Sequence, residues 1–265
     1  MKGKSIVLII YFILLFIPIY WMLNLSFKHT EEILTTLTFF PKDFTLDNYI
    51  HIFEDPVWRT SMLNSVIYVF MNVVLVLIAA VPAAYAFSRW NFRGDKHLFF
   101  WLLTNRMAPG AIFMVPMFQL YSNMGLFDTH FAVALSHCLF NLPLAIWILE
   151  GFFSGIPKAL DETAFIDGHS FANFFFKIFL PLVKPGLGVA AFFCFLYSWT
   201  EVMLTKTLTA INTKPIVVQL FRSMGAEGWD WGVLTAAGVI TMLPGILMVY
   251  FIRNHIAKGF AMGRV

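Results

Sequence analysis

The chain has 265 residues, of which 59% are hydrophobic and only 12% are charged, and its formal net charge is +3. A mean hydropathy of +0.76 is too high for a water-soluble domain of this size, so the composition excludes a soluble protein. The apolar runs are long and continuous, which excludes the alternating strands of a membrane β-barrel. We therefore expect an all-α integral membrane protein.

Apolar runs long enough to cross a bilayer, about 20 residues each, recur along the chain. Six spans fit, at roughly residues 5–27, 61–87, 98–122, 131–153, 186–204 and 231–252. The first run, in "MKGKSIVLIIYFILLFIPIYW", is too long for a signal peptide and precedes no small-residue cleavage site, so we expect it to be retained. Six spans put both termini on one side of the membrane.

Lysine and arginine are distributed unevenly between the segments that join these spans. Eleven of the 18 fall on the side of the termini and six on the other side, while Arg106 lies within the third span. Since cytoplasmic segments are enriched in lysine and arginine, both termini are expected in the cytoplasm. The loop 28–60 would then face outside, and the loop 154–185 would be cytoplasmic.

The outer loop 28–60 is too short for an independent domain, and its composition favours a short helix followed by an extended segment. No internal repeat or low-complexity tract is visible, so residues 1–265 are expected to form a single membrane domain. Cys138 and Cys194 lie inside apolar runs, and we interpret them as core residues rather than as a disulfide or a metal site.

The loop 154–185 has the pattern of two short helices joined by a tight turn. The first helix is expected over "PKALDETAFI", and Asp167-Gly168 ends it because glycine readily adopts the left-handed conformation. Ser170 is a suitable cap for the second helix, which Pro181 and Pro185 would end. One apolar face of this second helix is formed by Phe171, Phe174, Phe175, Ile178 and Phe179.

Neither of these helices, at about 15 Å, is long enough to cross a bilayer. The pair could lie on the membrane surface as a linker, or it could fit a groove on a cytoplasmic partner. Lys158, Asp161 and Glu162 favour the partner, since a membrane-surface helix would carry lysine and arginine rather than two carboxylates.

The segment Glu162-Thr163-Ala164-x-x-Asp167-Gly168, followed after nine residues by Ile178-x-Leu180-Pro181, resembles the EAA loop of binding-protein-dependent ABC importer permeases. Thr163 and His169 depart from the family pattern, in which alanine is usual at both positions. The resemblance covers nearly the whole chain, through "LDNYIHIF" (46–53), "NSVIY" (64–68), "AAYAFSRWNFRG" (83–94), "RMAPGAIFMVPMFQLYSNMGLFDT" (106–129), "GFFSGIP" (151–157) and "KGFAMGRV" (258–265). These segments are similar to the carbohydrate-type branch, in particular to the second permease of maltose and glycerol-phosphate type systems.

The resemblance implies a type I ABC importer permease with six transmembrane helices in the bacterial inner membrane. It implies a heterodimer with a second homologous permease, two cytoplasmic ATPase subunits that hold ATP and Mg²⁺, and an extracytoplasmic solute-binding protein. The solute would be a sugar, a polyol, glycerol or a related molecule. The EAA loop would dock in a cleft of the ATPase through Glu162, Thr163, Ala164, Asp167, Gly168, Ile178, Leu180 and Pro181.

The sequence contains no phosphate-binding loop, no zinc-protease motif and no nucleophile elbow. We therefore expect no catalytic site, metal site or bound cofactor on this chain, and no nucleic-acid partner. Charged residues within spans are functional candidates. Glu201 and Trp199, in a "SWTE" segment that resembles a Trp-Asn-Glu stretch of the family, could line the solute path, as could Arg106. Alternatively, Glu201 makes a structural hydrogen bond to another helix, and Arg106 pairs with a backbone carbonyl.

Two other classes of membrane protein compete with this interpretation. A secondary transporter driven by an ion gradient often has inverted repeats, and none is visible here. A membrane-embedded enzyme would need a cluster of acids, histidines or cysteines near one interface, and none is visible either. The ABC importer permease is therefore the function that we expect.

Overall fold

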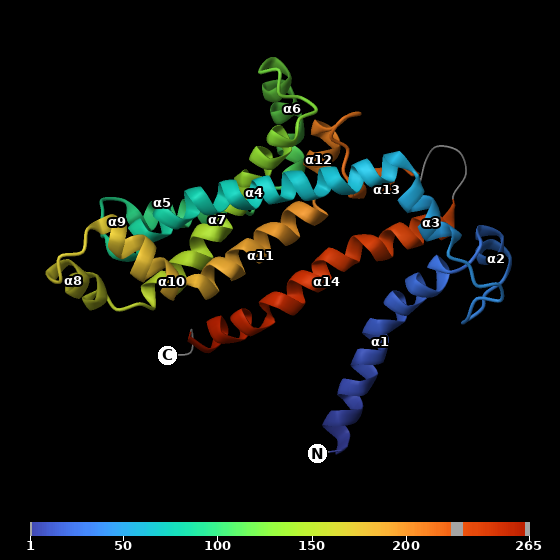
Figure 1. Cartoon of the computed structure of the whole chain (residues 1–265), viewed down its shortest axis with the longest axis horizontal. Helices are drawn as coiled ribbons and strands as arrows, with labels where there is room; N and C mark the ends of the chain where they lie inside the picture. Colours follow the sequence, from blue (N-terminus) through green and yellow to red (C-terminus); the bar gives the residue numbers. More distant parts are fainter. Residues whose placement is uncertain (1, 224–229, 263–265) are drawn as a thin grey trace. The chain divides into compact units, whose positions relative to one another are not determined.

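The structure is a computed structural model that describes residues 2–223 and 230–262. These residues form helices and contain no strand, which confirms the all-α fold (Figure 1). In chain order the elements are α1 (Lys2–Ser26), α2 (Thr30–Thr35), α3 (Asp47–Glu54), α4 (Pro56–Arg89), α5 (Asp95–Asn105), the 3₁₀-helix η1 (Gly110–Phe113), α6 (Met114–Asn123), α7 (His130–Ser154), α8 (Ala159–Ile166), α9 (Phe171–Phe174), the π-helix η2 (Phe175–Phe179), α10 (Leu180–Leu182), α11 (Lys184–Thr200), α12 (Met203–Leu208), α13 (Ile216–Ser223) and α14 (Trp231–Met262).

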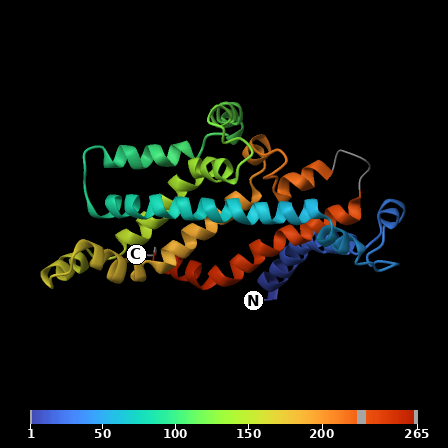
Figure 2. The ribbon, with the colours of Figure 1, turned by 45° about the horizontal axis from the view of Figure 1, so that its top comes forward.

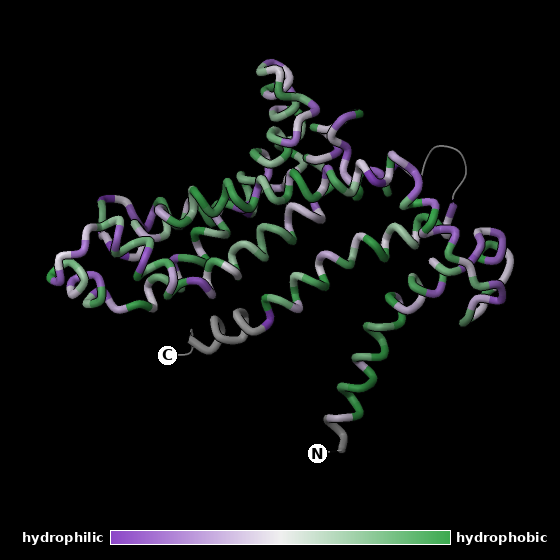
Figure 3. Tube along the Cα trace, viewed as in Figure 1, coloured by the Kyte–Doolittle hydropathy of each residue, from purple (hydrophilic) through white to green (hydrophobic). Residues whose placement is uncertain are grey.

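Four of the described helices are long and apolar enough to cross a bilayer, and Figure 3 shows the hydrophobic stretches of α1 and α4. The four are Ser5–Ser26, Pro56–Arg89, His130–Ser154 and Trp231–Arg253. Two further segments qualify only as bent pairs, Asp95–Asn105 with Gly110–Asn123 at 92° and Phe171–Leu182 with Lys184–Thr200 at 73°. The expected six spans are obtained if each bent pair counts as one span.

The third span, expected over 98–122, is interrupted between α5 and η1, while the fifth, expected over 186–204, is a helix only as far as Thr200. α5 ends at Asn105, close before Pro109, which has no N–H and biases the residue before it away from the helical conformation. α11 ends at Thr200, and Glu201 begins a short break before α12. Both breaks leave backbone groups that need other hydrogen-bond partners.

Contacts within the chain divide it into two units, Met1–Leu63 with Pro215–Ile246 and Asn64–Lys214 with Leu247–Val265. A single membrane domain over residues 1–265 stays a prediction. The loop 154–185 lies entirely within the second unit. Cys138 and Cys194 also lie in this unit, half-buried and buried, and both are free, as their interpretation as core residues predicts.

In the first unit, the segment that follows α1 folds back on the end of that helix. Lys28 is 1% exposed, and its Nζ donates hydrogen bonds to the carbonyl oxygen (2.7 Å) and the hydroxyl (2.8 Å) of Thr38. The Asn48 side chain donates to the carbonyl oxygens of Ser26 and Lys28, both at 2.9 Å. Residues 36–46 are not helical, which agrees with the expected extended segment, but a second short helix, α3, and the start of α4 also fall within residues 28–60.

In the second unit, α4, α7 and α11 are joined by three fully buried polar side chains, one from each helix. The Asn141 amide donates to Asn72 Oδ1 at 2.7 Å, and the Ser198 hydroxyl donates to the same oxygen at 2.8 Å. Such bonds add to the packing of membrane helices, between which the hydrophobic effect contributes little. Gly186 of α11 allows a close approach, since a Cβ there would lie 2.6 Å from Phe152 of α7.

The aromatic core of the second unit lies at the end of α4 that carries Arg89. Tyr85 of α4, Phe153 of α7 and Phe179 of η2 are buried there together. Figures 1 and 2 both place α8, α9 and α10 at this end of α4. The two short helices predicted from the sequence are therefore built onto the ends of two long membrane helices.

Candidate functional site

The turn between α8 and α9 is a helix end terminated by glycine. Gly168 has a φ of 81°, in the left-handed region that glycine adopts without a steric cost. Its N–H donates to Phe165 O at 3.1 Å, and the N–H of His169 donates to Ala164 O at 3.0 Å, which satisfies the last carbonyls of α8. The Ser170 hydroxyl caps α9, as predicted. We call residues 159–182, which include α8 to α10, the hairpin.

The apolar face predicted for the second short helix packs on the ends of α4 and α7. Phe174 and Phe179 are fully buried, and the Phe179 ring centroid lies 5.0 Å from those of both Tyr85 and Phe153. Phe171 lies nearer to the turn and is 51% exposed. The base of the hairpin is thus held in the core, while its turn is exposed.

The second short helix ends between Pro181 and Pro185, as expected. It continues from α9 through η2 and α10 to Leu182, and a bend at Val183 separates it from α11. Pro181 has no N–H to bond the carbonyl four residues back, and the π-helical turn just before it accommodates the missing bond. Pro185 lies in the first turn of α11, where proline is tolerated.

A buried ion pair joins the first short helix to the end of α4. Arg89 donates from Nε to Asp161 Oδ2 at 2.8 Å and from Nη2 to Asp161 Oδ1 at 3.2 Å, and each residue is 8% exposed. The Tyr85 hydroxyl donates to Asp161 Oδ2 at 3.0 Å, and Lys158 Nζ donates to the Arg89 carbonyl at 2.9 Å. Asp161 and Lys158 therefore have partners within this chain, and of the three polar residues of the first short helix only Glu162 is left to favour a partner.

The exposed side of the hairpin carries acidic and apolar residues together. Glu162, Thr163 and Asp167 are exposed, and the neighbouring Ile166 is 85% exposed. The Thr163 hydroxyl donates to the carbonyl of Ala159 at 2.8 Å, so this departure from the family alanine is satisfied within α8. A surface of this kind offers charge and hydrocarbon to a protein partner.

The other residues of the predicted coupling set lie on the inner side of the hairpin or close to its base. Ala164 is 6% exposed, Ile178 and Leu180 are half-buried, and Pro181 is exposed. Beside them is an apolar depression of about 530 Å³. It is lined by Gly155, Ile156, Pro157, Ala159, Leu160, Thr163 and Leu182.

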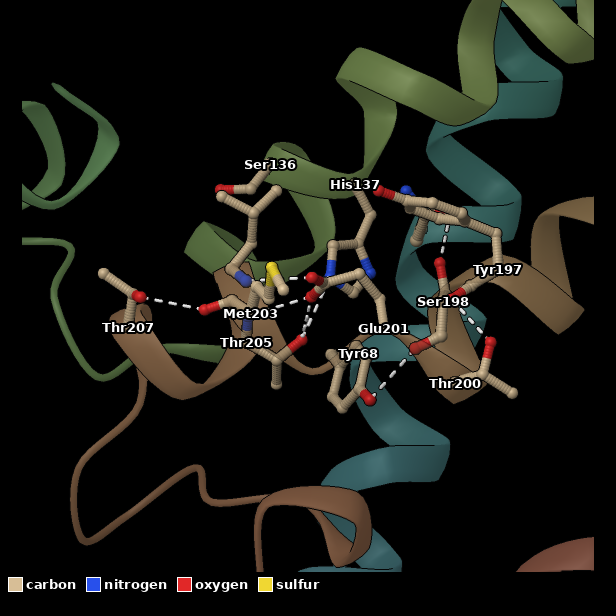
Figure 4. A network of polar contacts seen from close by, with 12 residues as sticks. Tyr68, Ser136, His137, Tyr197, Ser198, Thr200, Glu201, Met203, Thr205 and Thr207 are labelled. Carbon is tan, nitrogen blue, oxygen red and sulfur yellow. Dashed lines mark hydrogen bonds and ion pairs between the residues drawn. The ribbon is translucent and has the colours of Figure 1, made fainter. Parts of the chain in front are cut away.

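Glu201 lies at the break between α11 and α12 (Figure 4). Its Oε1 accepts the N–H of Leu204 at 2.9 Å, and its Oε2 accepts the N–H and the hydroxyl of Thr205 at 3.0 and 2.9 Å. The same Oε2 lies 3.2 Å from Nε2 of the buried His137 on α7. The carboxylate thus caps the start of α12 and links it to α7. These contacts favour the structural alternative for Glu201 over a place in the solute path.

The other two predicted solute-path residues also have partners within the chain. Arg106, at the end of α5, donates from Nη1 to the carbonyl oxygen of Phe140 at 2.9 Å, the alternative that the sequence left open. Trp199 is 6% exposed, and its ring stacks on Phe195 with the centroids 5.6 Å apart. The contacts of both residues are those of helix packing.

Asp128, which the sequence did not single out, organises a loop near the start of α7. Its carboxylate accepts the N–H groups of Ala210, Ile211, Asn212 and Thr213 at 2.9 to 3.2 Å. Burial raises the pKa of Asp128, but hydrogen bonds from these N–H groups outweigh burial and hold the pKa well below its usual range. No sequence pattern connects an isolated aspartate with a loop that begins 82 residues later.

We predict that Glu201→Gln lowers the free energy of unfolding by about 1–3 kcal/mol, because an amide nitrogen replaces one acceptor of a hydrogen-bonded, partly buried carboxylate. The measurement is thermal unfolding of the purified chain in detergent. Glu150→Gln is the matched control, since the Glu150 carboxylate accepts a hydroxyl from Ser154, which an amide oxygen can also do. Equal unfolding midpoints for the two variants would contradict a structural role for Glu201.

The relatives of this chain among known proteins are membrane components of transport systems. The family described as "binding-protein-dependent transport system inner membrane component" matches residues 76–262. The diacetylchitobiose uptake system permease protein NgcG of Streptomyces coelicolor is 30% identical over 259 residues, which cover 97% of this chain and 86% of the relative. The trehalose transport system permease protein SugB of Mycobacterium tuberculosis is 31% identical over 252 residues, which cover 94% and 92%.

Solved structures show the same fold. A bacterial ABC transporter involved in the import of the acidic polysaccharide alginate has a TM-score of 0.80 at 22% identity, covering 96% of this chain and 94% of that one. The MetNI methionine ABC transporter, in inward-facing conformations, has a TM-score of 0.59 at 17% identity, covering 81% and 99%. From its sequence relatives and its apolar helices, the chain is a multi-pass membrane protein and a non-enzymatic transport subunit. It belongs to the family of binding-protein-dependent transport system inner membrane components.

Proposed function

We propose that this chain is the permease subunit of an ATP-driven, binding-protein-dependent importer for a sugar, polyol, glycerol or related solute. The observation that carries the proposal is the hairpin, whose base is buried in the core while Glu162, Ile166 and Asp167 are exposed around its turn. A linker on the membrane surface would not need such an anchored base. Family membership argues against the ion-gradient-driven transporter that was the alternative.

The hairpin would dock in a cleft of a cytoplasmic ATPase subunit. Glu162 and Asp167 would form the polar contacts, and Gly168 would allow the sharp turn that sets their geometry. The exposed Thr163 and Pro181 would add to this contact surface, while the more buried Ala164, Ile178 and Leu180 would support it from within the hairpin. ATP and Mg²⁺ would bind the ATPase subunits, and this chain would hold no cofactor.

Further partners complete the proposed complex. The apolar side chains of α1 from Ile6 to Ile17 are about half exposed. They need contact with lipid or with another helix, and a second homologous permease would supply part of that contact. An extracytoplasmic solute-binding protein would deliver the solute. The relatives named for diacetylchitobiose, trehalose and alpha-glucoside transport support a carbohydrate as the solute.

The hairpin and both termini are proposed to lie in the cytoplasm, because the lysine and arginine distribution favours that side. We predict that a cysteine at Asp43 reacts with an impermeant maleimide in intact cells, and that one at Ile166 reacts only after permeabilisation. Both side chains are well exposed, so a lack of reaction reports the membrane side. The unmodified chain, with Cys138 and Cys194 inside the fold, gives the background. Labelling of both positions in intact cells would contradict this topology.

The proposed function itself is tested with the complex purified through a tag on this chain and reconstituted in proteoliposomes. We expect ATPase subunits to co-purify, and radiolabelled trehalose, diacetylchitobiose or glycerol to accumulate only with ATP and the binding protein. Dissipating ion gradients with ionophores is the control and should leave uptake unchanged. Uptake that follows an ion gradient without ATP would contradict the proposal.

We predict that Gly168→Val leaves the amount of chain in the membrane near normal and abolishes uptake. A β-branched residue is strained at a φ of 81°, by about 1–3 kcal/mol, which is enough to distort the turn but not to prevent insertion. Glu162→Ala should act in the same direction but more mildly. The measurements are membrane level, ATPase pull-down and ATP-driven uptake.

Gly94→Val is the matched control for this change. Gly94 has a φ of 87° and, as at Gly168, no atom beyond its two chain neighbours lies within 4 Å of the place that a Cβ would occupy, so the backbone strain is similar. It lies outside the hairpin, between α4 and α5, and its variant should retain uptake. Full uptake by the Gly168→Val complex would show that the hairpin is only a linker.

A further inference from the structure

The guanidinium of Arg89 is the point at which four helical elements meet. Two of its nitrogens bind the Asp161 carboxylate of α8. Its Nη1 donates to the carbonyl oxygens of Phe153 and Ile156, both at 3.1 Å, at the end of α7 and just beyond it. Its Cζ lies 5.1 Å from the ring centroid of Phe179 in η2, and Arg89 itself is the last residue of α4.

Contacts on both sides of the ion pair restrain its two partners further. The Tyr85 hydroxyl, one turn earlier on α4, donates to the same Asp161 oxygen that Arg89 Nε contacts. Lys158, just before α8, returns a hydrogen bond to the Arg89 carbonyl. α4 and the start of α8 are thus linked by four side chains with defined hydrogen-bond directions.

Stability alone does not explain an ion pair at this position. The desolvation of two buried charges offsets much of their attraction, and well-packed apolar residues often hold helices together as well. What the bidentate pair adds is direction, because a planar guanidinium fixes both the distance and the angle of the carboxylate that it binds. Apolar surfaces in the same place could slide past one another.

We propose that Arg89 and Asp161 are a positioning pair that makes α8 and the inner end of α4 one rigid body, so that movement of the docked hairpin is passed directly to a membrane span. The inference deepens the proposed function and rests on it for the source of the movement. Neither residue is needed to contact the ATPase, since both are buried. Their role is to keep the hairpin's exposed residues at a fixed orientation relative to α4.

The pair is tested by measuring how rigidly α8 is held to α4. Spin labels are placed on cysteines at Ile78 of α4 and Ile166 of α8, both strongly exposed, with Cys138 and Cys194 replaced by alanine. Pulsed electron paramagnetic resonance on the chain in lipid nanodiscs gives the distance distribution. We expect one narrow distance in the wild type and a broad or shifted distribution in Asp161→Asn.

Asp95→Asn is the matched control for Asp161→Asn. It is the same chemical change at the inner end of the membrane helices, but the Asp95 carboxylate accepts only the backbone N–H of Lys96 in the first turn of α5, so the distance distribution should stay narrow. Arg89→Lys removes the bidentate geometry of the guanidinium but keeps the positive charge, and it should also broaden the distance distribution. An unchanged narrow distance in Asp161→Asn, or in Arg89→Lys if Asp161→Asn does not insert, would overturn the proposal.

A second readout separates positioning from a purely structural role. In reconstituted complexes with equal amounts of bound ATPase, the solute taken up per ATP hydrolysed should fall by roughly 2- to 30-fold in Arg89→Lys, the range that single changes in a coupled network produce. A wild-type ratio in that variant would overturn the proposal. Absence of ATP-driven uptake in the wild type would contradict the proposed function instead, and the distance measurement would still test the pair.

Discussion

The structure depends on one constraint, which is that polar groups removed from water need partners within the protein. A membrane helix satisfies its own backbone, but every break or end leaves carbonyl and N–H groups without intrahelical bonds. At two of these places in the second unit, the partners are charged side chains. Arg89 binds carbonyls at the end of α7, and Glu201 binds N–H groups at the start of α12. Charge in this chain therefore accompanies interruptions of regular structure.

The same constraint explains Arg106. Its guanidinium binds the carbonyl oxygen of Phe140 in α7, next to Leu139, whose carbonyl lacks a helical partner because Pro143 has no N–H. Arg106 itself lies at the 92° bend between α5 and η1. A charge within an apolar stretch is a reasonable candidate for a transport path, but a bend in the helix supplies another reason for it. For Arg106 and Glu201 the neighbouring backbone accounts for the contacts.

Features set by local chemistry could be predicted from the sequence, while those set by distant contacts could not. The left-handed Gly168, the Ser170 cap and the buried face of Phe174 and Phe179 follow from neighbouring residues and helical periodicity. The partner of Asp161 lies 72 residues earlier in the chain, and Asp128 binds a loop 82 to 85 residues later. Residue spacing carries no information on such pairs. Hydropathy does not locate the bend in the third span, because it measures length and apolarity, whereas Pro109 limits where that helix can stay straight.

The position of the breaks also limits how the second unit can move. The ion pair of Arg89 and Asp161 and the aromatic core around Phe179 bind the hairpin to α4 and α7, so the contacts there oppose relative rotation of these elements. Regular hydrogen bonding is interrupted instead at residues 106–109, at Val183 and at Glu201. Helix ends and loops absorb changes in backbone angle at lower cost than helix interiors do. A displacement applied to the hairpin would therefore be carried through α4. The interruptions at residues 106–109, Val183 and Glu201 would absorb the accompanying changes in backbone angle.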